Sequence, residues 1–361
     1  MILSFLFVAI GLVLLVLGAD SLVSGASRIA QRFGIPSLII GLTIVAIGTG
    51  MPEITVSASA ALSGNTDLAL GNVVGSNIFN VLLILGIASL ILPLSVHVSL
   101  IRQEVPVMVG FSLLLLMLIL DGSLTGLEAG LLLVLGVCYV LLLVAQARRA
   151  ARKGRDVDVE LPDATGWLAR VPAGLLIALG LVGLVGGAQL LVTGATVIAL
   201  SLGISELVVG LTVVAIGTSL PELAASIAAA LRGQRDMAIG NAVGSNIFNI
   251  ALCLGIAGLV SPDGLGAPAQ LIGFDIYVMV VVAIVLLPLI ITQYTVSRTE
   301  GALLISWCVV YLVWTVLTAT GNTLAEPFSK LVLFGLLPAS MVFLCITVYA
   351  ALQGPKHNPH A

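Results

Sequence analysis

The sequence predicts an all-α polytopic membrane protein, built from two five-helix repeats of inverted topology and one additional C-terminal transmembrane helix. Of the 361 residues, 60% are hydrophobic and 9% are charged, whereas charged residues make up about 25% of a typical soluble domain. Apolar runs of about 20 residues, long enough to cross a bilayer as helices, follow one another along the chain. A long segment also occurs twice, which indicates internal duplication.

Eleven apolar windows predict the transmembrane helices. They cover residues 2–24, 36–63, 69–92, 103–120, 125–146, 172–200, 205–231, 238–260, 271–292, 301–319 and 328–352. The first window lacks the basic start of a signal peptide, so we expect a retained helix. The fourth, fifth, ninth, tenth and eleventh windows are nearly plain Leu, Val and Ile, which is typical of helices that serve packing.

The duplicated segment defines the domain organisation. Residues 41–87 return 169 residues later as 210–256 without a gap, and each copy carries one acid inside an apolar helix. The repeats therefore span 1–146 and 172–320, a polar linker covers 147–171, and residues 321–361 hold the additional helix and a tail. Because each repeat has an odd number of helices, the second copy enters the membrane from the opposite face. Inverted repeats are typical of secondary transporters that bind substrate near the midplane.

Basic residues predict the orientation, since Lys and Arg accumulate in short cytoplasmic loops. Those that follow the odd-numbered helices fall on one side: Arg28, Arg32, Arg102, the cluster at 148–155, Arg170, Arg232, Arg235, Arg298 and Lys356. Only Lys330 falls on the other side. We therefore expect a multi-pass protein of a bacterial-type cytoplasmic (inner) membrane, with the N-terminus outside and the linker 147–171 in the cytoplasm.

The two membrane acids are Glu53 and Glu222, each directly after a proline. An ionisable group at bilayer depth costs at least about 2.5–3.5 kcal/mol, so it marks a functional site by default. Thr49 and Thr218 lie four residues before the acids, which places hydroxyl and carboxylate on one helix face. The prolines break the helices, and freed carbonyls are tolerated at this depth only where they are buried or line a cavity. Ser219 joins this face in the second copy only.

The third and eighth helices add a second polar line at successive four-residue steps: Asn72, Ser76 and Asn80, and then Asn241, Ser245 and Asn249. Glycine pairs in GxxxG spacing permit close approach of these helices. The candidate ligands are all oxygen atoms, which suit hard cations such as Ca²⁺, with Na⁺ as a competitor of similar size. For the serines and asparagines, hydrogen bonding between helices is the alternative, and it weighs equally for Asn72 and Asn241. For Asp67 and Asp236, at helix starts, capping is favoured.

Other classes of function lack support in the sequence. A net charge of −3, dispersed among loops, offers no nucleic-acid surface. The four cysteines lie in apolar runs without metal-ligand spacing, so neither a zinc site nor a disulfide framework is predicted. No HExxH, GxGD or Ser/His pair indicates an intramembrane protease. We expect neither an enzyme nor a cofactor.

Four motifs carry a resemblance to a known family: GTGMPE at 48–53, GNVVGSNIFN at 71–80, GTSLPE at 217–222 and GNAVGSNIFN at 240–249. They resemble the two alpha repeats of the calcium/cation antiporter superfamily, specifically the prokaryotic sodium/calcium exchanger family. The resemblance covers the ten-helix core, about residues 1–320. The position of Gly50 is usually Ser in this family, and that of Asn249 is Asp in the best-known archaeal exchangers, so the cluster has one acid fewer.

The resemblance implies alternating access, in which Na⁺ entering the cell drives Ca²⁺ out through one central ion cluster. No nucleic acid or cofactor takes part, and one chain suffices for transport. The ligands carried over are Thr49, Glu53, Ser76, Asn80, Thr218, Ser219, Glu222, Ser245 and Asn249. One alternative couples Ca²⁺ or another cation to H⁺ or K⁺, since a membrane glutamate can carry a proton. A passive cation channel would use the same oxygens but is not favoured by the midplane breaks.

Overall fold

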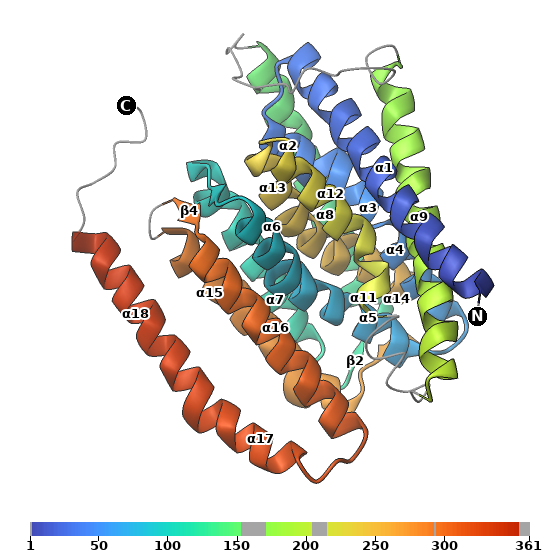
Figure 1. Cartoon of the computed structure of the whole chain (residues 1–361), viewed down its shortest axis with the longest axis vertical. Helices are drawn as coiled ribbons and strands as arrows, with labels where there is room; N and C mark the ends of the chain where they lie inside the picture. Colours follow the sequence, from blue (N-terminus) through green and yellow to red (C-terminus); the bar gives the residue numbers. More distant parts are fainter. Residues whose placement is uncertain (1, 153–170, 204–214, 292–293, 354–361) are drawn as a thin grey trace.

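The structure, a computed structural model, describes residues 2–152, 171–203, 215–291 and 294–353. This part of the chain is almost entirely helical (Figure 1). Within it, nine helices are long and apolar enough to cross a membrane, and a tenth span consists of two half-helices, Ser37–Thr49 and Met51–Leu62, bent by 43°. The predicted membrane fold is confirmed, and so is the predicted break before Glu53.

The first repeat contains five spans, in which η denotes a short π-helical segment. They are α1 (Ile2–Phe33); α2 (Ser37–Ile40), η1 (Gly41–Val45), α3 (Ala46–Thr49) and α4 (Met51–Leu62); α5 (Thr66–Phe79), η2 (Asn80–Leu85) and α6 (Gly86–Ile91); η3 (Leu100–Glu104) and α7 (Val105–Leu118); and α8 (Gly126–Arg152). The first helix therefore runs nine residues beyond its predicted end at residue 24.

The second repeat follows the same plan. Its elements are α9 (Ala173–Ser201); α11 (Ala215–Thr218) and α12 (Leu220–Leu231); α13 (Arg235–Phe248), η6 (Asn249–Leu254) and α14 (Gly255–Val260); η7 (Leu271–Asp275) and α15 (Ile276–Ile291); and α16 (Arg298–Ala319). Most of the first half of the seventh predicted helix, 205–231, lies outside the described residues.

The additional C-terminal helix is present as α17 (Ala325–Leu331), η8 (Val332–Leu336) and α18 (Leu337–Gln353). It lies at the periphery of the bundle, beside α15 and α16 (Figure 1). Two indole groups of α16 attach it: Trp307 Nε1 donates to Ser340 Oγ at 3.0 Å, and Trp314 Nε1 donates to Ser329 Oγ at 3.1 Å. Within a membrane such hydrogen bonds are an effective link between helices.

Two short antiparallel ladders join the repeats. β1 (Leu94–Ser95) pairs with β4 (Thr295–Val296), and β2 (Ser123–Leu124) pairs with β3 (Leu265–Gly266). In each ladder, the loop between the third and fourth helices of one repeat meets the loop between the fourth and fifth helices of the other. β4 and β2 lie at opposite ends of the bundle (Figure 1). This exchange of loop types at opposite ends is what an inverted repeat requires.

The first helices of the two repeats, α1 and α9, form a close antiparallel pair along one edge of the bundle (Figure 1). Glycines recur every seventh residue on the facing sides, at positions 11, 18 and 25 and at positions 180, 187 and 194. A Cβ added to Gly18 would lie 2.7 Å from the main-chain nitrogen of Leu184, and one added to Gly187 would lie 2.8 Å from the carbonyl oxygen of Gly11. The two backbones are therefore in direct contact, as small residues permit in membranes.

The GxxxG prediction is confirmed in the second repeat. A Cβ on Gly240 would lie 2.8 Å from the carbonyl oxygen of Leu38, and one on Gly244 would lie 3.0 Å from the Cα of Leu42. Helix α13 thus packs tightly on the half-helix that leads to Thr49. For the GxxxG pair of the first repeat, the equivalent partner segment is around 207–215, and most of that segment lies outside the described residues.

Candidate cation-binding site

Both membrane acids lie at the start of the second half of a broken helix. Glu53 is in the first turn of α4 and Glu222 in the first turn of α12, each with proline at the helix start. Proline is tolerated there because its missing N–H needs no partner. The helix N-terminus favours a carboxylate. Each side chain is only 1% exposed, so both acids are buried.

The first-repeat glutamate is contacted by a hydroxyl of the second repeat. Ser219 Oγ lies 3.4 Å from Glu53 Oε1 and 3.2 Å from Ser76 Oγ. The second carboxylate oxygen, Glu53 Oε2, is buried without a hydrogen-bond partner. The three predicted residues therefore meet, and they come from α4, α5 and the break before α12.

The second-repeat glutamate lacks the equivalent hydroxyl, because the counterpart of Ser219 is Gly50. A Cβ at Gly50 would lie 3.7 Å from Glu222 Oε1 and 3.9 Å from Asn249 Oδ1. Glu222 Oε2 and Ser245 Oγ, the counterpart of Ser76 Oγ, are both buried without a partner. The two halves of the site thus contain similar residues, but their side chains make different hydrogen bonds.

Asn241 and Asn72 hydrogen-bond to the main chain of the broken helices and to hydroxyls of both repeats. Asn241 Nδ2 donates to Ser226 Oγ at 2.9 Å and to the carbonyl of Glu222 at 3.1 Å, while its Oδ1 accepts from Thr49 Oγ1 at 3.3 Å. For this pair the geometry favours the structural alternative. Asn72 makes the equivalent contacts with Ser57 Oγ (3.0 Å), the carbonyl of Glu53 (3.5 Å) and Thr218 Oγ1 (3.2 Å).

Two further asparagines, which the sequence reasoning missed, cross between the repeats. Asn80 Nδ2 donates to Asn246 Oδ1 at 2.9 Å, and Asn249 Nδ2 donates to Asn77 Oδ1 at 3.1 Å. Asn77 Nδ2 also donates to the carbonyl of Asn246 at 3.3 Å. The signal that could have revealed them is their duplication inside the SNIFN text. Asn80 and Asn249 each begin a π-helical segment, a feature that is frequent at functional sites.

Unsatisfied oxygen atoms mark the centre of the cluster. In the described part of the chain, five buried side-chain polar atoms lack a hydrogen-bond partner, and four of them belong to predicted ligands: Glu53 Oε2, Glu222 Oε2, Asn80 Oδ1 and Ser245 Oγ. Buried polar groups are normally paired, so each exception needs a reason. Carboxylate, amide and hydroxyl oxygens without donors are suited to a hard cation. Cys253, also missed, donates its thiol to the carbonyl of Glu53 at 3.2 Å.

A second pair of duplicated acids corrects the prediction that helices 4, 5, 9 and 10 serve only packing. Glu104 ends η3 and Asp275 ends η7, at equivalent positions of LIRQEVPVMV and LIGFDIYVMV. The hydroxyl of Tyr139 donates to Glu104 Oε2, and that of Tyr311 donates to Asp275 Oδ1 at 3.1 Å. The offset here is 171 residues because the preceding loop is two residues longer in the second repeat.

These acid–tyrosine pairs pack against the helices that carry the proposed ligands. The ring of Tyr139 lies 6.0 Å from that of Phe248, and the ring of Tyr311 lies 6.3 Å from that of Phe79. Each phenylalanine directly precedes a predicted ligand asparagine. The outer helices therefore contribute buried polar groups that hold the inner helices in place.

Three other acids, Asp67, Asp236 and Asp20, lie at helix starts or in an ion pair. Asp67 and Asp236 lie in the first turns of α5 and α13, as expected, although the side chain that caps α5 is Asn65, which accepts from the Leu68 N–H at 3.2 Å. Asp20 forms an ion pair with Arg232.

The inverted ten-helix fold and its buried oxygen cluster define a secondary transporter for cations. The sequence profile described as Sodium/calcium exchanger protein matches residues 3–145 and 173–317, so the chain belongs to this family.

Similar proteins agree with this assignment. The putative antiporter CaxA of Alkalimonas amylolytica is 42% identical over 312 residues, which cover 84% of this chain and 96% of CaxA. The sodium/calcium exchanger MaX1 of Methanosarcina acetivorans is 34% identical, with 86% and 97% covered. The inner membrane protein YrbG of Escherichia coli is 41% identical, with 79% and 88% covered. The structure of the sodium-calcium exchanger NCX_Mj, soaked with 2.5 mM Na⁺ and 0.1 mM Ca²⁺, aligns with a TM-score of 0.74 at 33% identity over 87% of this chain and 98% of NCX_Mj.

The chain is therefore a multi-pass membrane antiporter of cations from the Ca²⁺ and Na⁺ exchanger family, and it is not an enzyme. The predicted family and fold class are confirmed. The domain boundaries and the sufficiency of one chain stay predictions.

Proposed function

We propose that this protein exports Ca²⁺ in exchange for Na⁺ by alternating access, with both ions using the central oxygen cluster. The observation that carries the proposal is the set of four unpartnered oxygens on Glu53, Glu222, Asn80 and Ser245. Two carboxylates neutralise one Ca²⁺, and neutral oxygens complete the six to eight ligands that this ion takes. The proposed ligands are Thr49, Glu53, Ser76, Asn80, Thr218, Ser219, Glu222, Ser245 and Asn249.

The direction of transport follows from the proposed orientation. Arginines follow the odd-numbered helices, which favours an external N-terminus and a cytoplasmic linker at 147–171. The name of YrbG, an inner membrane protein, supports the same compartment for this chain. Exchange across that membrane would use inward Na⁺ flow to move Ca²⁺ outward.

The second candidate is an antiporter of Ca²⁺ or another cation coupled to H⁺ or K⁺. It is favoured by Gly50 and Asn249, since this cluster lacks a hydroxyl and an acid at positions where Na⁺-coupled relatives are expected to have them. Without those groups, the site offers fewer charged and hydroxyl oxygens for Na⁺. A proton could instead be carried by Glu53 or Glu222.

The test is ⁴⁵Ca²⁺ uptake into proteoliposomes under one imposed gradient at a time, of Na⁺, K⁺ or H⁺. We expect Na⁺-driven uptake by the wild type and a loss of about 100-fold or more in Glu53→Gln and Glu222→Gln, because each variant leaves a buried Ca²⁺ half neutralised. Glu326→Gln, at an exposed acid of α17, is the matched control and should transport normally.

Two results would contradict the proposal. Near-normal Na⁺-driven uptake by both glutamine variants would rule out the proposed site. Uptake that persists when choline replaces Na⁺ at a fixed pH gradient would assign the coupling to H⁺.

A further inference from the structure

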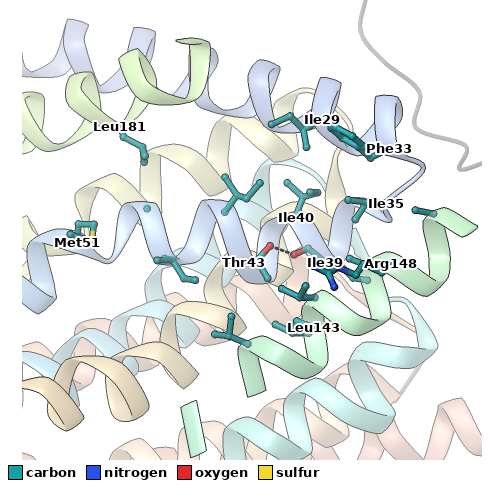
Figure 2. Close-up of a pocket in the computed structure, with 17 residues that line it drawn as sticks. Ile29, Phe33, Ile35, Ile39, Ile40, Thr43, Met51, Leu143, Arg148 and Leu181 are labelled. Atoms are coloured by element: carbon teal, nitrogen blue, oxygen red, sulfur yellow. Dashed lines mark hydrogen bonds between the residues drawn. The ribbon is translucent and has the colours of Figure 1, made fainter. Parts of the chain in front are cut away.

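An apolar groove of about 710 Å³ lies beside the ion cluster, on the outer side of the broken second helix (Figure 2). The half-helix α2–η1–α3 forms its floor. One wall comes from the last turns of α1 with Leu181 of α9, and the other from the last turns of α8. This volume falls within the range of about 300–1,000 Å³ that is usual for ligand pockets.

The body of the groove has no polar group to offer. Every lining side chain except those of Thr43 and Arg148 is apolar, and Thr43 Oγ1 is occupied by the carbonyl of Ile39 at 2.6 Å. A water-soluble ligand would therefore lose its hydration without gaining hydrogen bonds. A hydrocarbon chain loses nothing there.

One end of the groove is cationic. Figure 2 shows Arg148 and Phe33 at this end, with Met51 at the opposite end. The guanidinium carbon of Arg32 lies 5.9 Å from the centre of the Phe33 ring, so a second guanidinium lies near the same mouth. Neither arginine forms an ion pair with an acid among the residues that the structure describes.

We infer that this groove binds an anionic glycerophospholipid, with one acyl chain along α2–α3 and the phosphate at Arg148 and Arg32. The charge at one end and the apolar body match the two parts of that molecule. Basic pockets between transmembrane helices are suited to anionic head groups, and guanidinium–phosphate hydrogen bonds are charge-assisted. A neutral lipid would add no counter-charge to the two guanidinium groups, which have no acid partner in the described part of the chain.

The groove lies against the half-helix that carries one of the proposed ligands. The last floor residue of α3 is Gly48, which directly precedes the proposed ligand Thr49, and Met51 lies just beyond the break. A bound acyl chain therefore packs against the half-helix that carries the first ligand. The inference itself concerns lipid binding and does not depend on which ions are exchanged.

The test titrates delipidated full-length protein in detergent with phosphatidylglycerol or phosphatidylcholine of equal chain length and counts bound lipids by native mass spectrometry. We expect one phosphatidylglycerol to bind preferentially. Arg148→Gln should weaken that binding about five-fold and abolish the preference. Arg149→Gln is the matched control, because this neighbouring arginine is also exposed but does not line the groove. Ala147→Trp should fill the groove and displace the lipid.

Three outcomes would overturn the inference. Equal binding of both lipids by wild type and Arg148→Gln would show a crevice that accepts any acyl chain. An equal effect of Arg149→Gln would show a general basic surface. Undiminished binding to Ala147→Trp would place the lipid elsewhere. Gel filtration and melting temperature confirm that each variant is folded.

Discussion

Asn77 and Asn246 determine how the side-chain amides of the proposed ligands Asn249 and Asn80 are oriented. An asparagine amide has one acceptor oxygen and one donor nitrogen on opposite sides of its plane. Asn246 Oδ1 accepts from Asn80 Nδ2, which turns the Asn80 oxygen toward the cluster, where it has no other partner. Asn77 holds Asn249 in the same way from the other repeat. Each repeat thus orients a ligand of its twin.

This arrangement predicts coupling across the repeats. Asn246→Leu removes the acceptor for Asn80 and should weaken Ca²⁺ binding about five-fold, the value of one hydrogen bond. When combined with Asn80→Ala, the two effects should be far from additive. Isothermal titration calorimetry on the purified protein measures both. The control cycle pairs Asn246→Leu with Ser219→Ala, whose partners Glu53 and Ser76 are not those of Asn246, and additivity is expected. Equal coupling in the two cycles would contradict the crossed arrangement.

Gly50 is the residue at which the two halves of the site differ. Its backbone angles, φ −77° and ψ 2°, are open to any L-residue, and Ser219 adopts nearly the same conformation. Glycine is therefore not required by the backbone angles, and a Cβ at this position would lie 3.0 Å from the carbonyl oxygen of Ala46, which must shift by a few tenths of an ångström. Its absent side chain leaves Ser245 Oγ without the hydroxyl partner that Ser219 provides for Ser76 Oγ.

Gly50→Ser should restore the missing hydroxyl and tighten cation binding about three- to ten-fold, since hydrogen bonds to charged groups are among the stronger ones. Calorimetric titration with Ca²⁺ and with Na⁺ reports the change for each ion. Gly50→Ala adds the same Cβ without the oxygen and is the control. If serine and alanine give the same affinities, the hydroxyl plays no part in binding.

At the scale of the elements, α1 and α9 are joined by backbone contact instead of interlocking side chains. Because lipid tails are as apolar as leucine, such helices associate through close packing and not through the hydrophobic effect. Gly187 lies in the contact, whereas a Cβ on the adjacent Gly186 would meet nothing within 4 Å among the described residues. The pair offers a direct comparison on one helix.

Gly187→Val should push the helices apart and lower stability by about 1–3 kcal/mol, the usual cost of overpacking. Gly186→Val should have little effect. The melting temperature of the purified protein, followed by a thiol-reactive dye or by loss of the monodisperse peak, measures the difference. Equal destabilisation by both variants would show that helix propensity, and not the contact, sets the cost.

For the molecule as a whole, the architecture could be predicted because the internal duplication is visible in the amino-acid sequence. The constant offset between Glu53 and Glu222 revealed the repeat, and the odd number of helices revealed its inversion. Helix periodicity also predicted a common face for Thr49 and Glu53, but the helix breaks between these two residues and bends by 43°, so that prediction does not hold across the break. The extra helix could be predicted from its apolar length alone.

The contacts between the repeats could not be predicted in the same way. Periodicity shows which residues share a helix face but not which helix lies opposite, so the pairing of Asn72 with Thr218 and of Asn77 with Asn249 stayed hidden. Glu104 and Asp275 were missed because a longer loop shifts their offset, and both lie near the ends of apolar helices. The tyrosines that satisfy them lie on other helices, and periodicity does not show that those helices face the acids.

The positions of the ladder strands along the chain also determine when each ladder can form during synthesis. β1 is complete at Ser95, but its partner β4 begins at Thr295, 200 residues later along the chain. At about 5–20 residues per second, the ribosome needs roughly 10–40 s to cover that distance. The partners of α1 and Glu53 are made earlier, since α9 ends at Ser201 and Ser219 follows it along the chain. The first half of the protein thus waits for the β1–β4 ladder during synthesis, and the packing of α16 on α6 forms later still, because α16 follows β4 along the chain.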